Sequence, residues 1–226
     1  MSARDFGGQA PVTAQGGCRI YAVVEAGPGA LERVEAALAA ADLAALLLVP
    51  VGDATTGDAR AAKPLVEAAQ RAGVAVLLSG DAQLVRILKA DGVHVPPSRA
   101  IAEAYEEARE IVGQRAIVGA DPGISRHDAM ALAEAGADYI AFGAPSHLND
   151  RAKARARRDE LVAWWGEIFQ IPCVAFDVET ADEAETLAAA GADFIAVTLA
   201  PGQPPAAVRD ALAGIAAAIR APAVAS

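Results

Sequence analysis

The chain has 226 residues, of which 54% are hydrophobic but only 4% aromatic, so we expect a single domain with an aliphatic, alanine-rich core. Its formal net charge is −10, and such a surface repels nucleic-acid phosphates and anionic lipid headgroups, which argues against both as partners. No apolar run is long enough to cross a bilayer and the first residues lack a secretory pattern, so we expect a cytoplasmic protein.

The predicted elements follow one another in a regular order. Residues 1–17 are rich in Gly, Ala and Gln and are expected to form a flexible N-terminal arm. Short apolar runs rich in β-branched residues then predict strands at 18–25, 43–51, 74–80, 92–96, 115–121, 138–144, 172–178 and 194–200. Helical patterns follow them at 29–42, 57–72, 82–90, 99–112, 126–135, 153–169, 181–190 and 204–220. Eight βα units predict one α/β domain, a (β/α)8 or TIM barrel, over residues 18–226.

A repeated segment supports the barrel. The stretches AEAGADYIAFG and AAAGADFIAVT are nearly the same, and KADGVHV is a looser copy. In each copy a helix ends and runs directly into a strand, which is the αβ unit that a barrel repeats. The Asp residues of the three copies, Asp91, Asp138 and Asp193, stand at the amino ends of their strands. Because barrel enzymes carry their chemistry at the opposite face, we interpret these three residues as structural.

Carboxylates gather at the predicted functional face, where the strands end. They follow five different strands, at Glu25, Asp53, Asp81, Asp121 and Asp177. Several carboxylates at one mouth could bind Mg²⁺ or raise one another's pKa, whereas a carboxylate just before a helix acts as its cap. The cap is favoured for Asp53 and Asp81, and both interpretations stay open for Asp177.

The three histidines lie in different settings. His94 lies between two valines inside a predicted strand, which favours a hydrogen-bonded core residue. His147 follows the sixth strand in a loop, and it is the first choice as a catalytic histidine because loops on a rigid scaffold carry function. Ser125 and His127 stand two residues apart at a helix start, where their side chains point in different directions, so a nucleophilic pair is weakly specified.

Two segments are candidates for binding an anion. The loop 119–127 precedes a helix, and free backbone N–H groups at a helix start bind phosphate. The segment with Thr198 and Gly202 occupies the place where phosphate-binding barrels hold their anion. A basic cluster, Arg151, Lys153, Arg155, Arg157 and Arg158, is interpreted as a solvated helix start unless an anionic ligand lies beside it.

Several of these segments together point to one family. ADGVHV at the fourth strand, Ser-x-His after the fifth, EAGADYIAFG at the sixth and AGADFIAV at the eighth resemble the thiamine phosphate synthase family. That family also includes regulatory barrels without the synthase activity. The resemblance implies an enzyme that joins a hydroxymethylpyrimidine diphosphate to a thiazole phosphate and releases pyrophosphate. It further implies Mg²⁺ as cofactor and small phosphorylated molecules as partners, and a homodimer is a further expectation.

The resemblance also implies site residues. The family's Gly-x-Ser-x-His motif falls on Gly123, Ser125 and His127, and its sixth-loop Lys is met by Arg151 or Lys153. With the strand-end residues, the expected set is catalytic Ser125, His127 and His147; substrate- and phosphate-binding Ser79, Gly143, Arg151, Lys153, Thr198 and Gly202; and metal-binding Asp81 and Asp177.

Other positions depart from the family's pattern. Where its second strand carries Gln-x-Arg-x-Lys for the diphosphate, this chain has Leu46, Leu48 and Pro50, and its seventh-strand Gly-Gly reads Asp177-Val178. Charge-assisted contacts contribute about 1.5–3 kcal/mol each, so their loss predicts weak diphosphate binding. The alternative hypothesis is a non-synthase relative that regulates or binds a small ligand. A third hypothesis, an aldolase or epimerase with a phosphorylated substrate, finds no strand-end lysine for a Schiff base.

Overall fold

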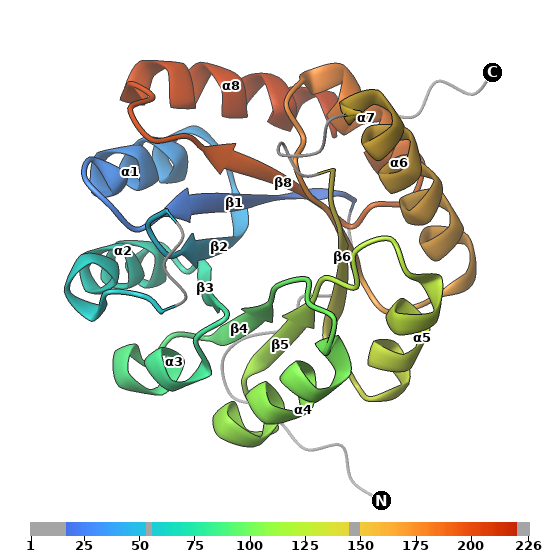
Figure 1. The fold of residues 1–226 in the computed structure, drawn as a ribbon. Coiled ribbons are helices and arrows are strands. Elements are labelled where there is room, and N and C mark those ends of the chain that lie inside the picture. Colours follow the sequence, from blue (N-terminus) through green and yellow to red (C-terminus); the bar gives the residue numbers. More distant parts are fainter. Residues whose placement is uncertain (1–16, 53–55, 145–149, 221–226) are drawn as a thin grey trace, which may run out of the picture.

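The protein is a closed barrel of parallel strands inside a ring of helices (Figure 1). The structure is a computed structural model that describes residues 17–52, 56–144 and 150–220. In these ranges eight strands alternate with eight helices, and the strands pair in sequence order from β1 round to β8 and back to β1. The predicted TIM barrel is therefore confirmed, while the expected N-terminal arm lies outside the described residues except for Gly17.

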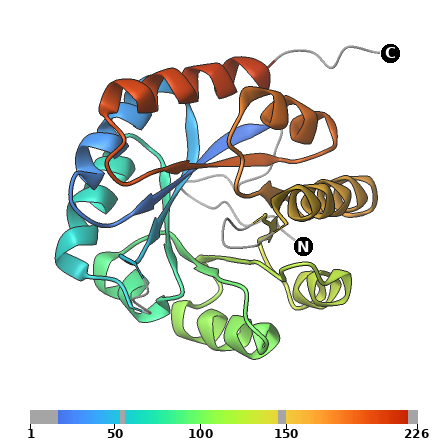
Figure 2. The same ribbon diagram turned by 45° about the horizontal axis from the view of Figure 1, so that its top comes forward.

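Each predicted strand and helix corresponds to one observed element. The strands are β1 (Arg19–Glu25), β2 (Leu43–Val49), β3 (Ala75–Ser79), β4 (Gly92–Val95), β5 (Ile117–Ala120), β6 (Tyr139–Phe142), β7 (Cys173–Ala175) and β8 (Phe194–Leu199). The helices are α1 (Ala30–Ala40), α2 (Ala59–Arg71), α3 (Ala82–Leu88), α4 (Ile101–Val112), α5 (Arg126–Glu134), α6 (Arg151–Ile168), α7 (Ala181–Ala189) and α8 (Pro205–Ala218). A turned view shows the helices surrounding the strands (Figure 2). In the part of the chain that the structure describes, none of the helices has the length and hydropathy of a membrane span.

Alternate residues of each strand belong to two separate cores, as the period of two in a strand requires. One core lies between the strands and the helices and the other fills the barrel interior. On β2, Leu46 and Leu48 belong to the outer core, whereas Leu47 and Val49 face the interior. Leu46 and Leu48, which the sequence comparison set against the family's diphosphate-binding residues, thus face the helices and not the barrel interior. The inward positions are also apolar, so β2 presents no charged side chain to the mouth.

The barrel interior contains a chain of three hydrogen-bonded polar side chains. The Tyr139 hydroxyl lies 2.9 Å from the Tyr21 hydroxyl and 2.9 Å from Nδ1 of His94. All three residues are buried. A Cβ on Gly119 would lie 2.0 Å from the Tyr139 ring, so only glycine at that position lets the ring pass. The prediction of a hydrogen-bonded core histidine at position 94 is confirmed.

The three repeated Asp residues join neighbouring strands at the amino end of the barrel. Asp91 accepts a hydrogen bond from the Val76 N–H at 2.8 Å, and its own N–H donates to the Val76 carbonyl. Asp138 does the same with Val118, and Asp193 with Cys173. Each Asp thus fixes the start of one strand to the strand before it. The structural interpretation of the repeat is confirmed.

The aromatic cluster at the end of α6 packs against the barrel. Trp165 is fully buried, stacks on Phe169 with ring centroids 4.0 Å apart and contacts Phe142 of β6 edge-on. Its indole N–H donates to the Ile171 carbonyl at 2.7 Å. These contacts hold α6 against the sheet.

Candidate functional site

The mouth of the barrel is formed by inward-facing residues at the carboxyl ends of the strands. Every second residue of a strand faces the barrel interior. Counting on from the interior residues of β3, β5, β6 and β8, the inward positions at the mouth are Ser79, Asp121, Gly143 and Thr198. Asp121 is buried, Ser79 and Gly143 are half-buried, and Thr198 is exposed. The predicted strand-end residues Ser79, Gly143 and Thr198 thus share one mouth.

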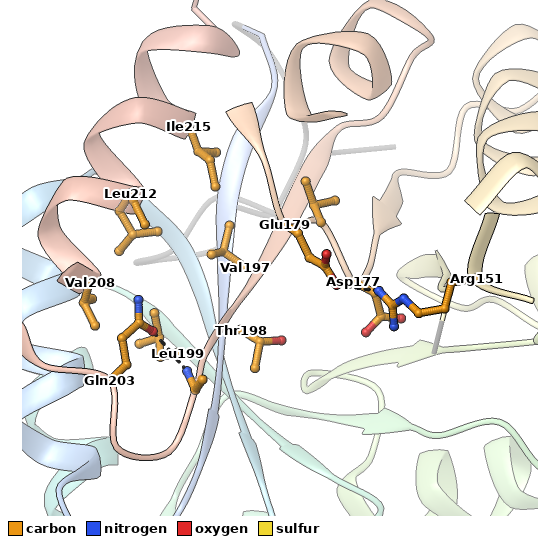
Figure 3. Close-up of a pocket in the computed structure, with 13 residues that line it drawn as sticks. Arg151, Asp177, Glu179, Val197, Thr198, Leu199, Gln203, Val208, Leu212 and Ile215 are labelled. Carbon is orange, nitrogen blue, oxygen red and sulfur yellow. Dashed lines mark hydrogen bonds and ion pairs between the residues drawn. The ribbon is translucent and has the colours of Figure 1, made fainter. Parts of the chain in front are cut away.

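A cavity of about 360 Å³ opens on the β7–β8 side of this mouth (Figure 3). Its polar lining comprises Arg151, Asp177, Glu179, Thr198 and Gln203. Its apolar wall is formed by β8 and α8, at Val197, Leu199, Val208, Leu212 and Ile215. The cavity therefore brings together three of the predicted residues, Arg151, Asp177 and Thr198.

The turn before α8 borders this cavity. Gln203 accepts a hydrogen bond from the Ala200 N–H at 3.2 Å, and Gly202 has the left-handed φ of 77° that the turn requires. The α8 N-cap is Pro204, which supplies no capping side chain. The first-turn N–H groups of α8 thus lack a side-chain acceptor, and N–H groups at such a helix start can bind an anion.

The basic cluster on α6 is only in part the solvated helix start that was expected: Lys153 is exposed, whereas Arg158 is buried. Arg151 and Arg155 both form ion pairs with Glu179, on the segment between β7 and α7. Arg158 is 1% exposed and donates to the Phe176 carbonyl at 3.2 Å and the Asp177 carbonyl at 3.1 Å. It also lies 3.3 Å from Glu183 of α7. Acidic partners on the next unit bury this face of α6, which the spacing of the basic residues along the chain did not reveal.

Asp177 has a strained backbone and a fixed carboxylate. Its φ is 57°, a left-handed value that few residues with a Cβ adopt. One carboxylate oxygen, Oδ2, accepts a hydrogen bond from the Ala144 N–H at 2.9 Å. Arg158 donates to the Asp177 carbonyl, and the Asp177 carboxylate reaches Ala144, just beyond the end of β6.

Asp121 faces Asp177 across Gly143. A Cβ on Gly143 would lie 2.8 Å from Oδ2 of Asp177 and 3.8 Å from Oδ2 of Asp121. Burial raises the pKa of Asp121 to about 6; the hydrogen bond from the Gly123 N–H, at 2.7 Å, opposes this shift and the charge of Asp177 adds to it. The mouth therefore holds two carboxylates close together, one of them largely withdrawn from water.

Replacing Asp121 by asparagine is expected to stabilise the protein at alkaline pH. The pKa of Asp121 is raised in the folded state, from 3.8 to about 6, so the folded protein binds this proton more tightly than the unfolded chain. Stability is therefore lost as pH rises from about 4 to above 6, by on the order of 2–3 kcal/mol in all. Asp121→Asn lacks this loss, so urea unfolding should show it more stable than wild type at pH 8 and equal at pH 4. An equal difference at both pH values would contradict the assignment.

Two aromatic rings lie beneath these carboxylates. His94 stacks on Phe176 with ring centroids 5.2 Å apart, and Phe176 directly precedes Asp177. Burial lowers the pKa of His94 to about 4, so the ring is neutral at pH 7. The Tyr139 hydroxyl is hydrogen-bonded to both the Tyr21 hydroxyl and Nδ1 of His94.

The predicted catalytic pair is not assembled as a pair. Ser125 is the N-cap of α5 and its hydroxyl accepts a hydrogen bond from the Asp128 N–H at 3.1 Å. His127, in the first turn of α5, is exposed, and no hydrogen bond joins the two side chains. His147, the first choice among the histidines, lies outside the described residues, as does Asp53.

The remaining predicted residues are dispersed. Asp81 is the N-cap of α3; its two oxygens accept from the Leu84 N–H at 2.9 Å and the Gly57 N–H at 3.3 Å, as the cap interpretation predicted. It follows β3, which lies across the barrel from β7, so the structure does not bring Asp81 to Asp177. The side chain of Lys153 is exposed and does not line the cavity.

Sequence reasoning missed three residues of the site. Gln203 and Glu179 line the cavity, and Arg158 supports it from beneath. A glutamine in a Pro- and Gly-rich turn before the last helix was a usable signal. The burial of Arg158 had no signal in the sequence, because its partners lie on a different βα unit.

The chain matches one protein family over most of its length. The family "Thiamine monophosphate synthase" matches residues 20–200. A thiamine-phosphate synthase of Rhodospirillum centenum is 36% identical over 203 residues, which is 85% of this chain and 95% of that protein. One from Erythrobacter litoralis is 42% identical over 142 residues, covering 62% of this chain and 65% of that protein.

Solved structures share the fold. Thiamine phosphate pyrophosphorylase from Pyrococcus furiosus superposes with a TM-score of 0.70 at 24% identity, over 88% of this chain and 95% of that one. Tryptophan synthase of Mycobacterium tuberculosis has the same TM-score at 16% identity, over 91% and 94% of the two chains. Barrels named for different activities thus match equally well, so the likeness in shape supports the fold alone.

Proposed function

Because the chain belongs to the thiamine monophosphate synthase family, we propose that it forms thiamine phosphate from a hydroxymethylpyrimidine diphosphate and a thiazole phosphate. The bond between the pyrimidine methylene carbon and the diphosphate oxygen breaks, and its electron pair leaves with pyrophosphate. The thiazole nitrogen supplies the pair for the new C–N bond. The observation that supports this proposal is the cavity at the carboxyl ends of β7 and β8, where barrels commonly hold phosphate.

The residues of the cavity would bind the anionic end of a substrate. Arg151 supplies a fixed positive charge, and Thr198 and Gln203 supply neutral hydrogen-bond donors. The uncapped N-terminus of α8 adds free N–H groups and the positive end of the helix dipole. The apolar wall of β8 and α8 excludes water beside these groups, which strengthens each charged contact.

The residues expected to bind Mg²⁺ do not fit a joint site. Each Asp81 oxygen accepts a backbone N–H group in the cap of α3, and Asp177 lies across the barrel. In the described parts of the chain, no three His, Cys, Asp or Glu side chains gather as a metal cage would require. No step of the proposed reaction is therefore assigned to Mg²⁺.

A synthase assay with matched variants tests the proposal. The purified chain is incubated with both substrates, with and without added Mg²⁺, and thiamine phosphate is quantified by chromatography. Arg151→Ala should lower kcat/KM about 10- to 150-fold, because one charge-assisted contact contributes roughly 1.5–3 kcal/mol. Lys153→Ala, the same change on an exposed side chain of the same helix, should leave it unchanged. Binding of thiazole phosphate with no product under any condition would instead establish the non-synthase, ligand-binding alternative.

A further inference from the structure

The polar lining of the β7–β8 cavity carries more negative than positive charge. Among the described residues that line it, Arg151 is the one basic side chain, whereas Asp177 and Glu179 are both acidic. Thr198 and Gln203 are neutral. A phosphate that enters this cavity therefore meets two carboxylates for one guanidinium, and like charges at such short range oppose its binding. Tight binding of an anion requires one of these carboxylates to move away.

The two carboxylates differ in how firmly they are held. Asp177 is fixed, because its Oδ2 accepts from the Ala144 N–H at 2.9 Å and its carbonyl accepts from the buried Arg158. Glu179 lies between β7 and α7, and 54% of its side chain is exposed. Within the described ranges its carboxylate accepts hydrogen bonds from arginine side chains and from no backbone N–H. Glu179 is therefore the carboxylate that can turn away.

Glu179 bridges two guanidiniums of α6. Its Oε1 accepts from Arg151 and its Oε2 from Arg155. In Figure 3 the guanidinium of Arg151 extends toward Asp177 and Glu179. Arg155 also forms an ion pair with Glu183 of α7, at 3.2 Å. Glu179 can thus release Arg151 and keep Arg155, and an anion bound to Arg151 then leaves none of these charges without a partner.

We propose that Glu179 is an internal competitor for the anion site. Its carboxylate occupies the guanidinium of Arg151, and a phosphate takes its place there when Glu179 turns to Arg155 alone. Each phosphate must therefore break one charge-assisted contact before it makes its own, which lowers the affinity of the cavity. A weaker hold on the anion favours release of a phosphorylated product, so Glu179 adjusts how long such a ligand stays bound.

This inference rests on the proposed function only in taking the cavity as an anion site. It requires neither the synthase reaction nor a particular phosphorylated ligand. A carboxylate paired with an arginine can also serve to position that arginine for a ligand. Loss of a positioning carboxylate weakens ligand binding, whereas loss of a competing one strengthens it. The two roles of Glu179 therefore predict opposite changes in the Kd of phosphate.

Calorimetric titration of the full chain with inorganic phosphate at pH 8, where phosphate is mostly a dianion, tests the proposal. Glu179→Gln should lower the Kd about tenfold, because it removes a competitor held by two ion pairs at the surface. Glu160→Gln is the matched control: Glu160 is also exposed and also pairs with an arginine of α6, Arg157, at 3.1 Å. This variant should leave the Kd unchanged. Adding Arg151→Ala to Glu179→Gln should abolish the gain.

The outcomes separate the competitor from the proposed function. An unchanged Kd in Glu179→Gln would overturn the proposal, and a higher Kd would do so by making Glu179 a positioning residue. An equal gain in Glu160→Gln would also overturn it, since net surface charge would then be the cause. So would the absence of phosphate binding by every variant at millimolar concentration. If the synthase assay yields no product while Glu179→Gln binds phosphate more tightly through Arg151, the competitor is supported and the proposed function is not.

Discussion

Arg158→Met is expected to lower the free energy of unfolding by about 3–5 kcal/mol, because removing the buried guanidinium leaves the carbonyls of Phe176 and Asp177 without their donor. Arg158 is 1% exposed, and its guanidinium serves two backbone carbonyls and the carboxylate of Glu183. Methionine fills similar space but donates no hydrogen bond. For a domain of this size the loss corresponds to a melting temperature lower by roughly 10 °C, measurable by calorimetry.

The adjacent residue provides the control for this change. Arg157 pairs with Glu160 one turn away and donates to the Ile124 carbonyl, both at the surface. Arg157→Met should change stability by less than about 1 kcal/mol, as exposed ion pairs do. Similar losses of unfolding free energy in the two variants would mean that the buried contacts of Arg158 do not stabilise the protein.

Gly119→Ala is expected to lower the free energy of unfolding by about 3–5 kcal/mol, because overpacking of a dense core adds to the loss of buried hydrogen bonds. The new Cβ would lie 2.0 Å from the Tyr139 ring. The ring cannot move away while its hydroxyl keeps both 2.9 Å contacts, to Tyr21 and to His94. Displacing it therefore leaves His94 without its Nδ1 partner, and thermal unfolding together with the imidazole NMR signals of His94 should show both effects.

A second glycine gives the opposite expectation for the same substitution. A Cβ on Gly214, inside α8, would meet no atom within 4 Å. Gly214→Ala should therefore stabilise the protein by roughly 0.5–1 kcal/mol through the better helix propensity of alanine. If Gly119→Ala left the stability as little reduced as Gly214→Ala, the close packing of the Tyr139 ring against Gly119 would be contradicted.

The fold could be predicted because its signals are local. Strands and helices follow from hydrophobic period and capping residues; at the start of α7, for example, the Thr180 hydroxyl accepts from the Glu183 N–H. The repeated Gly-Ala-Asp segments gave the strand starts, since each Asp bonds to the strand next to it. Local signals of this kind need no knowledge of distant residues.

The site could be predicted only in part. Strand ends placed Thr198 and Asp177 at the mouth, because the carboxyl ends of parallel strands meet on one face. The hydroxyl of Ser125, which the sequence assigned a catalytic role, caps α5 in the structure. A serine before a helix fits a cap and a catalytic motif equally well, and only its hydrogen-bond partner distinguishes the two.

By itself, the sequence determined the eight βα units, their order and the amino-end Asp contacts, because each depends on residues within a single unit or its neighbour. The tertiary structure alone decided that Asp121 and Asp177 face one another across Gly143 and that Arg158 is buried beneath them. These relations join different βα units, and closure of the barrel sets them. Charge in this mouth is therefore a property of the closed barrel, which no single segment of the chain encodes.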